Sequence, residues 1–345
     1  MSDRAAVRSG AVSLAVGLGA LVWIALVATQ GQGRWPWAAF VIAAAAPFLL
    51  LPSSLVQVPL KFLFAAKPWR VWAIMAAAGL AGALLSAASG ATQWKYIALW
   101  PVCALLATWA AGVGEESQPT ASRLLLLALP IWILAGVWDA QLQVRVPGTI
   151  DLGLAYFAAL DMALFLLLIA RPLVSLHAEY AMSLREAGIA VGAVLALLVV
   201  ALPVGYLVGF LHYNLRWISL PYAAGRLVGL VLFVGVPEEL LFRGLIQEAF
   251  EKFWGRRAGW IWASVLFGLT HVVKHVPRLH LTGGTENRFH LLLVWMGALN
   301  WRYALLATFA GLAYGWVYRR TGRLSAAALT HGLVDWAWGT FLLVP

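Results

Sequence analysis

The sequence is typical of an all-α polytopic membrane protein with about eleven transmembrane helices. Of its 345 residues, 63% are hydrophobic and only 11% are charged, and the mean hydropathy is +0.85. Soluble globular domains contain about 45–50% apolar and about 25% charged residues. The 19 tryptophans suit a protein anchored at two membrane interfaces, where this side chain is enriched. We therefore expect an integral, multi-pass membrane protein.

Runs of roughly 20 apolar residues, the length that spans a bilayer as a helix, recur along the chain. The first run is too long for the apolar region of a signal peptide, and no small-residue cleavage site follows it. We therefore expect it to be retained as a transmembrane helix. The expected spans are residues 11–29, 36–56, 69–90, 94–112, 121–138, 150–170, 186–211, 222–250, 257–274, 291–318 and 324–344.

Two of these runs are longer than one span requires, and we expect both to be broken. Pro237 interrupts the run at 222–250, because proline lacks the N–H of a helix interior and its ring clashes with the preceding turn. Asn300 and Arg302 interrupt the run at 291–318, so we expect its first part to lie in the membrane interface.

The chain divides into two regions of different character. Residues 1–180 are rich in Ala, Leu and Trp and hold no ordered set of His, Glu, Asp or Cys suited to chemistry. We expect them to form a transmembrane helical region that could serve as a docking platform or a partner interface. All the groups of polar residues within the expected spans lie in residues 185–345. We expect the boundary between the two regions at residues 171–185.

The basic residues indicate the orientation in the membrane. Cytoplasmic loops carry an excess of Lys and Arg. With the N terminus in the cytoplasm, the cytoplasmic segments hold more of these residues than the opposite side does, including Arg4, Arg8, Arg319, Arg320 and Arg323. We expect a cytoplasmic N terminus and an external C terminus, in a bacterial inner or plasma membrane.

Neither the net charge nor the single cysteine predicts a further function. The formal net charge is +10, but the basic residues are scattered singly between apolar runs rather than clustered on one face. We therefore expect no nucleic-acid partner. Cys103 is alone, which excludes a disulfide framework and a metal cluster built on cysteine.

The segment Val236–Gly244, which reads VPEELLFRG, places two carboxylates and an arginine inside an apolar run. Ionisable groups at membrane depth are costly and mark candidate functional sites. Glu239 and Arg243 have the i,i+4 spacing of an ion pair on one helix face. Glu238 lies about 100° around the helix and has no such local partner. The spacing predicts a structural role for Glu239 and a chemical role for Glu238.

Two later segments carry the other polar residues. Phe267 and His271 are spaced four apart in the run at 257–274, and His331 and Asp335 are spaced four apart in the last run. Counted from the expected cytoplasmic ends, Glu238 and the histidines lie about 12–21 Å deep at 1.5 Å per residue. A common depth predicts one shared site formed by three helices.

Together these segments resemble the CPBP family, the CAAX proteases and bacteriocin-processing enzymes that are also called Abi. The family's ordered motifs are Glu-Glu-x-x-x-Arg, Phe-x-x-x-His and His-x-x-x-Asn/Asp. Here they are Glu238-Glu239-x-x-x-Arg243, Phe267-x-x-x-His271 and His331-x-x-x-Asp335. Each motif alone is weak, but the ordered set is specific, and it covers roughly residues 185–345.

The resemblance implies a CPBP/Abi-like helical core and an intramembrane endopeptidase of the glutamic type. Glu238 would be the general base that activates water, and His271 would help to hold that water. His331 and Asp335 would stabilise the oxyanion of the tetrahedral intermediate. The supporting residues would be Glu239, Arg243 and Phe267.

The chain departs from the family pattern at the last motif position. Many members have asparagine there, and its amide can donate a hydrogen bond to an oxyanion. Asp335 can donate only when it is protonated. We therefore expect Asp335 to orient and charge His331, as a carboxylate does for a catalytic imidazole.

No cofactor is expected, and a zinc-dependent variant of the protease is the alternative. Glu239, His271 and His331 would then be the ligands, with one position open for water. The sequence lacks His-Glu-x-x-His, so no single helix supplies a pair of metal ligands.

The expected partners are the lipid bilayer and a membrane-associated protein or peptide substrate, cut for example at a C-terminal sorting or prenyl-type tail. The alternative function is a non-enzymatic membrane protein, such as a bacteriocin-immunity factor, that binds through the same fold. A transporter should show inverted repeats. Here the polar groups occupy one half of the chain only.

Overall fold

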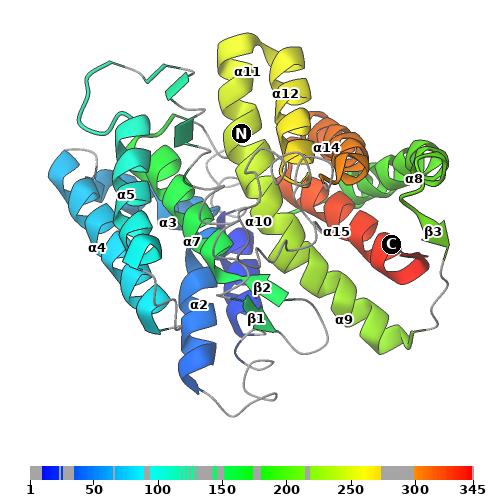
Figure 1. The fold of residues 1–345 in the computed structure, drawn as a ribbon, viewed down its shortest axis with the longest axis horizontal. Helices are drawn as coiled ribbons and strands as arrows, with labels where there is room; N and C mark the ends of the chain where they lie inside the picture. Colours follow the sequence, from blue (N-terminus) through cyan, green and yellow to red (C-terminus); the bar gives the residue numbers. More distant parts are fainter. Residues whose placement is uncertain are drawn as a thin grey trace, which may run out of the picture.

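The described part of the computed structural model consists almost entirely of helices, in an amino-terminal and a carboxy-terminal group that lie side by side (Figure 1). Most of the predicted span 121–138 and the first part of 291–318 lie outside the described residues. The structure describes residues 10–22, 25, 35–64, 67–88, 94–117, 119–120, 122–123, 126–127, 130, 143–145, 151–173, 180–213, 218–272 and 299–343.

The amino-terminal group begins with a helix at Gly10–Val22. The further elements described in this group are α2 (Trp35–Leu50), α3 (Ser54–Phe64), α4 (Pro68–Ala88), α5 (Trp94–Ala110), β1 (Gln143–Arg145), β2 (Asp151–Gly153), α7 (Leu154–Leu164) and the π-helix η1 (Phe165–Ala170).

The carboxy-terminal group begins at Leu184, where a capping box fixes the start of the first helix. Ser183 accepts from the backbone N–H of Glu186, and the Glu186 carboxylate accepts from the backbone N–H of Ser183. The elements described in this group are α8 (Leu184–Leu207), β3 (His212–Tyr213), α9 (Leu220–Leu230), η2 (Val231–Gly235), α10 (Val236–Glu239), η3 (Leu240–Gln247), α11 (Glu248–Trp254), α12 (Arg256–Leu269), α14 (Trp301–Thr321), α15 (Leu324–Phe341) and β4 (Leu342–Leu343).

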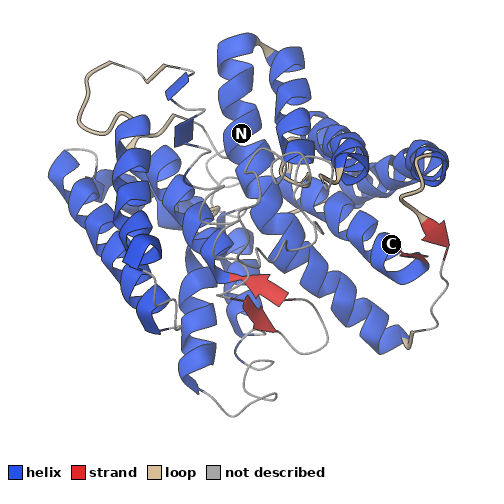
Figure 2. Ribbon diagram, in the orientation of Figure 1, coloured by secondary structure: helices blue, strands red, loops and turns tan. Residues whose placement is uncertain are grey.

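Two short β-ribbons depart from the purely helical prediction (Figure 2). β1 pairs with β2, and β3 pairs with β4, both antiparallel. The second ribbon shortens the last predicted span: α15 ends at Phe341, and the next two residues pair with His212 and Tyr213 instead of continuing the helix to residue 344.

Two helices in the described part are long and apolar enough to cross a membrane: Leu184–Leu207, with 24 residues, and Leu220–Trp254, with 35 residues. Shorter apolar helices occur at Gly10–Val22, Ser54–Phe64, Ile97–Ala110 and Tyr156–Ala170. The helical class is therefore confirmed, and the number of about eleven transmembrane helices stays a prediction.

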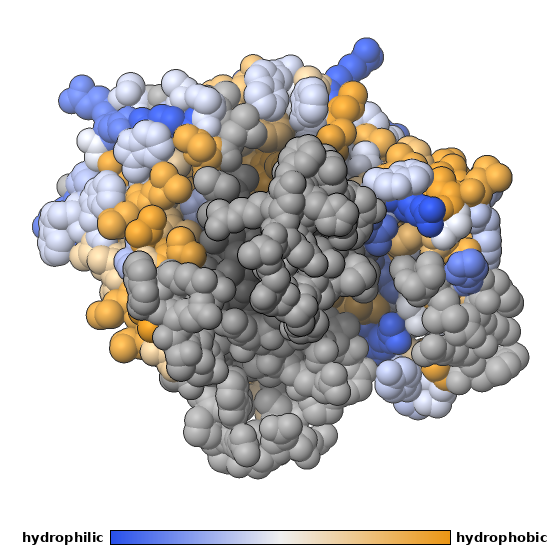
Figure 3. All heavy atoms as spheres, in the orientation of Figure 1, coloured by the Kyte–Doolittle hydropathy of each residue, from blue (hydrophilic) through white to orange (hydrophobic). Residues whose placement is uncertain are grey.

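Large apolar side chains are exposed on several helices. Phe62 on α3 and Leu195, Val199 and Leu207 on α8 are among the exposed ones. The space-filling view shows apolar residues at the left and right of the face in view (Figure 3). Exposed large apolar side chains on long apolar helices fit the expectation of a membrane protein.

Small residues let α12 and α14 pack closely. A Cβ on Gly311 would lie 3.1 Å from the Ser264 carbonyl oxygen, and one on Gly315 would lie 2.5 Å from the Trp260 ring. Close approach of helix backbones at small residues is the usual way in which transmembrane helices pack. The close packing at both glycines brings α14 against the helix that carries Phe267 and His271.

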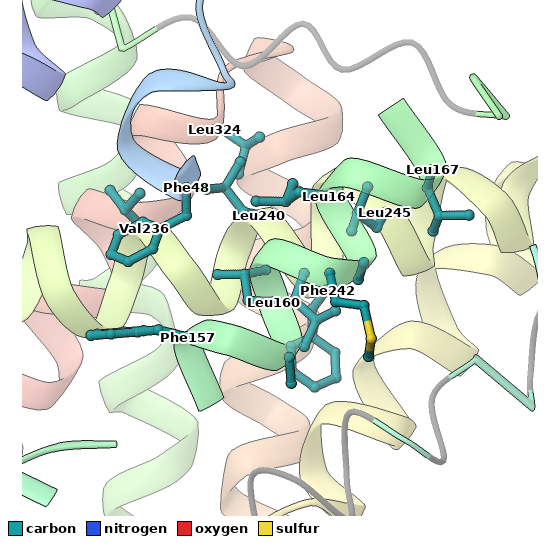
Figure 4. Close-up of a cluster of buried hydrophobic side chains, with 14 of the residues drawn as sticks. Phe48, Phe157, Leu160, Leu164, Leu167, Val236, Leu240, Phe242, Leu245 and Leu324 are labelled. Carbon is teal, nitrogen blue, oxygen red and sulfur yellow. The ribbon is translucent and has the colours of Figure 1, made fainter. Parts of the chain in front are cut away.

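The two helical groups share one hydrophobic core. Phe157, Leu160 and Leu164 of α7 lie in the same buried cluster as Leu240 and Leu245 of η3 (Figure 4). The amino-terminal region therefore packs directly behind the helix that carries the Glu-Glu pair. The predicted division into residues 1–180 and 185–345 stays a prediction, but the two parts are in contact.

Candidate active site

The helix from Leu220 to Trp254 carries the Glu-Glu pair at the centre of the site. We predicted a break at Pro237, and this prediction is wrong, because the helix is continuous through this residue. The chain winds more widely on both sides of α10, as the π-helices η2 and η3; the Val236 N–H, for example, donates to the carbonyl oxygen of Val231 five residues back. A wider turn accommodates the proline ring, and such turns are frequent at functional sites.

Glu239 and Arg243 form the predicted i,i+4 ion pair. Nε of Arg243 lies 2.9 Å from Oε2 of Glu239, and both side chains are fully buried. The two atoms do not have the geometry of a hydrogen bond, so the contact is an ion pair without a hydrogen bond. The guanidinium also lies 5.2 Å from the ring of Phe267 and 5.7 Å from the ring of Tyr314, within the range of cation–π attraction.

The second oxygen of Glu239 binds His331 from α15. Oε1 of Glu239 lies 2.9 Å from Nδ1 of His331, across 92 residues of sequence. A carboxylate paired with arginine can only accept, so Nδ1 carries a proton and donates it to Glu239. Sequence reasoning missed this bond, because it had given Glu239 a partner on its own helix only.

Two further carboxylates face the other nitrogen of His331. Nε2 lies 3.8 Å from Oε2 of Glu238 and 3.5 Å from Oδ2 of Asp335. The Glu238 side chain is 16% exposed and that of Asp335 is 35% exposed, whereas Glu239 is fully buried. Glu238 and Asp335 are therefore the carboxylates that solvent or substrate can reach. The carboxylate that holds the imidazole through a short hydrogen bond is Glu239, and Asp335, to which we had given the orienting role, lies farther away on the Nε2 side.

Aromatic rings hold the two imidazoles. Tyr314 of α14 stacks on His331 with ring centroids 4.5 Å apart and ring planes 19° apart. The Phe267 ring contacts His331 edge-on at 5.7 Å and His271 at 4.8 Å. Both histidines therefore pack against one phenylalanine. Sequence reasoning also missed Tyr314, and the signal that could have found it is a large polar aromatic residue between Gly311 and Gly315.

His271 lies at the end of α12, where its ring is bound by the helix itself. Nδ1 lies 2.9 Å from the carbonyl oxygen of Phe267, to which it can only donate. In this tautomer Nε2 carries the lone pair. Tyr303 packs edge-on against the ring at 4.8 Å. Tyr303 is in turn placed by Asn300, which caps α14 by accepting from the Tyr303 backbone N–H, so the predicted interruption at Asn300 is confirmed as the start of a helix.

The ligands considered for zinc are engaged in other contacts. Glu239 has its two oxygens on Arg243 and His331, and His271 has Nδ1 on the Phe267 carbonyl. In the described part of the chain, no three or more His, Cys, Asp or Glu side chains are grouped so that they could hold a metal ion. The set Glu239, His271 and His331 therefore does not form one metal shell here.

Comparison with known proteins identifies the segment that carries these residues. Residues 219–337 match a family model described as Type II CAAX prenyl endopeptidase Rce1-like. This region is Rce1-like. The match supports membership of the CPBP family, as the motifs had indicated.

The Rce1-like region covers about a third of the chain and contains Glu238, Glu239, Arg243, Phe267, His271, His331 and Asp335. Its family is a membrane-embedded family of proteases. No curated protein and no solved structure matches the chain. All the named site residues thus lie within the matched segment, and residues before 219 lie outside it.

Proposed function

We propose that this chain is an intramembrane endopeptidase of the CAAX-protease type, which hydrolyses a peptide bond of a membrane-associated protein or peptide. The observation that carries the proposal is the unequal engagement of the two adjacent glutamates. Glu239 is fully buried between Arg243 and His331, whereas Glu238 is partly exposed and lies 3.8 Å from His331. Arg243 and His331 hold the Glu239 carboxylate in place, whereas the Glu238 carboxylate is accessible to a substrate.

In the proposed reaction Glu238 takes a proton from a water molecule, and the water oxygen bonds to the carbonyl carbon of the scissile peptide. The carbonyl becomes a tetrahedral oxyanion. The C–N bond then breaks, and the proton held by Glu238 passes to the amine of the leaving peptide. General-base catalysis of this kind contributes about 10²–10⁴-fold to the rate.

The imidazoles have separate roles in this scheme. Nε2 of His271 carries the lone pair and can accept a hydrogen bond from the attacking water. His331 is anchored at Nδ1 by Glu239, so its Nε2, when protonated, donates to the oxyanion. One such donor is worth about 2.7–4 kcal/mol in a site that excludes water. Asp335 lies 3.5 Å from Nε2 and would orient the ring for this bond.

The substrate class follows from the family description. We infer that the substrate carries a C-terminal tail of the prenyl type, because CAAX prenyl endopeptidases act on such tails. The exposed apolar side chains of the long helices are suited to a substrate that reaches the site from the bilayer.

The test compares the wild type with Glu238→Gln on a candidate membrane-anchored peptide. Glu238→Gln keeps the side-chain volume and removes the base, so turnover should fall at least about 10²-fold while thermal stability is retained. Equal turnover by the two proteins would end the glutamate-protease proposal. Binding of the peptide without any turnover by the wild type would favour the non-enzymatic alternative.

Chelation tests the zinc alternative separately. Because the proposed mechanism uses only side chains and water, we expect a chelator to leave turnover unchanged. Inactivation by the chelator that added Zn²⁺ reverses would instead place the metal in the mechanism.

A further inference from the structure

Arg243 has more hydrogen-bonding capacity than the described residues use. Its side chain is fully buried, and its ion pair with Glu239 is made through Nε without a hydrogen bond. Nε, Nη1 and Nη2 all lack a hydrogen-bond partner among the described residues. A buried donor without a partner costs free energy, so buried groups of this kind are usually bonded to protein or to ordered water.

Gln247, about one helical turn after Arg243, has an unbonded group of the opposite kind. Its side chain is fully buried, and Nε2 donates to Oε1 of Glu251 at 2.9 Å. Because an ionised carboxylate can only accept, the amide cannot be reversed, and Oε1 lies on the side away from Glu251. Oε1 has no hydrogen-bond partner among the described residues. An acceptor thus lies one turn from the donors of Arg243 on the same helix.

The two groups face α14 at consecutive residues. The guanidinium of Arg243 lies 5.7 Å from the Tyr314 ring, and a Cβ on Gly315 would lie 2.7 Å from Oε1 of Gln247. Residues four apart on a helix have Cβ atoms about 5–6 Å from one another. The donors and the acceptor are therefore near each other but not hydrogen-bonded to each other. Buried polar groups in this relation are typically bridged by a water molecule.

We propose that Arg243 and Gln247 bind an internal water molecule. The water accepts from an Nη–H of Arg243 and donates to Oε1 of Gln247, so each group gains its missing partner. Gln247 is then a positioning residue. Through the water it fixes the guanidinium, which contacts Glu239, and the other oxygen of Glu239 binds His331. The positioning role rests on the proposed function, whereas the water site does not.

The first experiment detects the water in the full-length protein by X-ray footprinting. A brief exposure converts bound water into hydroxyl radicals that modify adjacent side chains, and mass spectrometry locates the modified residues. Tyr314 is 1% exposed and contacts Arg243, so we expect its modification in the wild type. Phe157, 2% exposed in the apolar cluster, should stay unmodified. Gln247→Met keeps the length of the side chain but removes the amide, and most of the modification of Tyr314 should be lost.

Two further variants control for effects other than the loss of the water. Gln57→Met is the matched control, because Gln57 is a buried glutamine of α3 whose amide is bonded to Pro52 and Lys61; it should leave the modification of Tyr314 unchanged. Gln247→Asn retains an amide and should retain the modification. An unmodified Tyr314 in the wild type, or equal modification in the wild type and Gln247→Met, would overturn the water site. Thermal unfolding of each variant confirms that the compared proteins are folded.

Turnover of the same variants tests the positioning role. Gln247→Met should lower kcat about 10-fold with a similar KM, because the water acts on His331 through Arg243 and Glu239 rather than on the substrate. Gln247→Asn should restore most of kcat. An unchanged kcat in Gln247→Met would overturn the positioning role.

The two readouts also separate this inference from the proposed function. Modification of Tyr314 that depends on Gln247, in a wild type that cleaves no candidate peptide, would support the water site and overturn the protease. Cleavage by a wild type in which Tyr314 stays unmodified would support the protease and overturn the water site.

Discussion

Glu238 and Glu239 are neighbours in sequence, but their surroundings differ. Glu239 contacts Arg243 through one oxygen and His331 through the other. Glu238 has a more distant contact with His331 and is partly exposed. Because an ionised carboxylate without partners is strongly disfavoured in an apolar interior, the complete engagement of Glu239 is what allows a second carboxylate to lie beside it.

The Glu239–Arg243 pair should be a main determinant of stability. Arg243→Ala leaves a buried carboxylate without its cation, and we expect a loss of about 3–5 kcal/mol in the free energy of unfolding. The measurement is thermal unfolding in detergent. Arg256→Ala is the matched control, because Arg256 is 72% exposed and its nitrogen lies 4.0 Å from Glu251; its melting temperature should stay near that of the wild type. An unchanged melting temperature in Arg243→Ala would show that the buried pair is not stabilising.

Tyr314 should act as a positioning residue for His331. The stacked ring is worth about 0.5–1.5 kcal/mol, so Tyr314→Leu should lower kcat about 2–12-fold with little change in KM. Tyr314→Phe keeps the ring and should restore most of the activity. A purely structural role would predict parallel losses of stability in both variants, and a loss in Tyr314→Phe as large as in Tyr314→Leu would refute the role of the stacked ring.

At the scale of elements, the site depends on the register of a single long helix. Each wide π turn adds a residue to the helix and rotates the side chains that follow by roughly 100°. The wide turn before α10 therefore contributes to the facing of Glu239 towards His331 of α15, and the wide turn after α10 contributes to the position of Arg243 beside Tyr314 of α14. A regular α-helix with the same sequence would present a different face to His331.

The contact between α12 and α14 gives an element-scale prediction. A Cβ on Gly268 would lie 2.5 Å from the Ala304 carbonyl oxygen and would also clash with the Thr308 side chain. Because a backbone atom cannot move aside cheaply, Gly268→Ala should separate the helices and lower the melting temperature. Gly188→Ala on α8 is the control, since nothing lies within 4 Å of its Cβ position, and it should be neutral or stabilising by about 0.5–1 kcal/mol. Equal melting temperatures for the two variants would contradict the close packing.

At the scale of the whole molecule, amino-terminal helices pack against the helix that carries the Glu-Glu pair. The rings of Phe48 of α2 and Phe157 of α7 pack at a tilt with centroids 4.8 Å apart, and Phe157 lies in the buried cluster that includes Val236 and Leu240 (Figure 4). This apolar packing holds one face of the Leu220–Trp254 helix, and the Glu239 side chain of the same helix points to α15. The described amino-terminal helices thus contribute to the position of the Glu-Glu pair through apolar packing.

Membrane orientation can be tested at the two ends of the long helix. We expect Lys252→Cys to be labelled by an impermeant thiol reagent from the cytoplasmic side and Leu220→Cys from the external side, because basic residues favour the cytoplasm. Both positions are exposed, and the native Cys103 is buried, so the unmodified protein serves as the unlabelled control. Labelling of Lys252→Cys from outside would reverse the predicted topology.

The sequence by itself determined the properties that depend on local spacing. Composition indicated a helical membrane protein, and the four-residue spacing of Glu239 and Arg243 was sufficient to predict their ion pair, because both lie on one helix face. The ordered motifs indicated the CPBP family, which the match of residues 219–337 supports. The convergence of Glu238, His331 and Asp335 also followed from their common depth.

Only the tertiary structure decided how the side chains of this shared site pair with one another and which further side chains join them. The bond from Glu239 to His331, the stacking of Tyr314 and the position of Gln247 against Gly315 depend on helix rotation and on how closely the backbones approach. Spacing along one helix is set by its rise and turn, which are nearly constant. Which faces of two helices meet depends on side-chain packing and, here, on the π turns on either side of Pro237. A periodic sequence pattern predicts neither the packing nor the π turns.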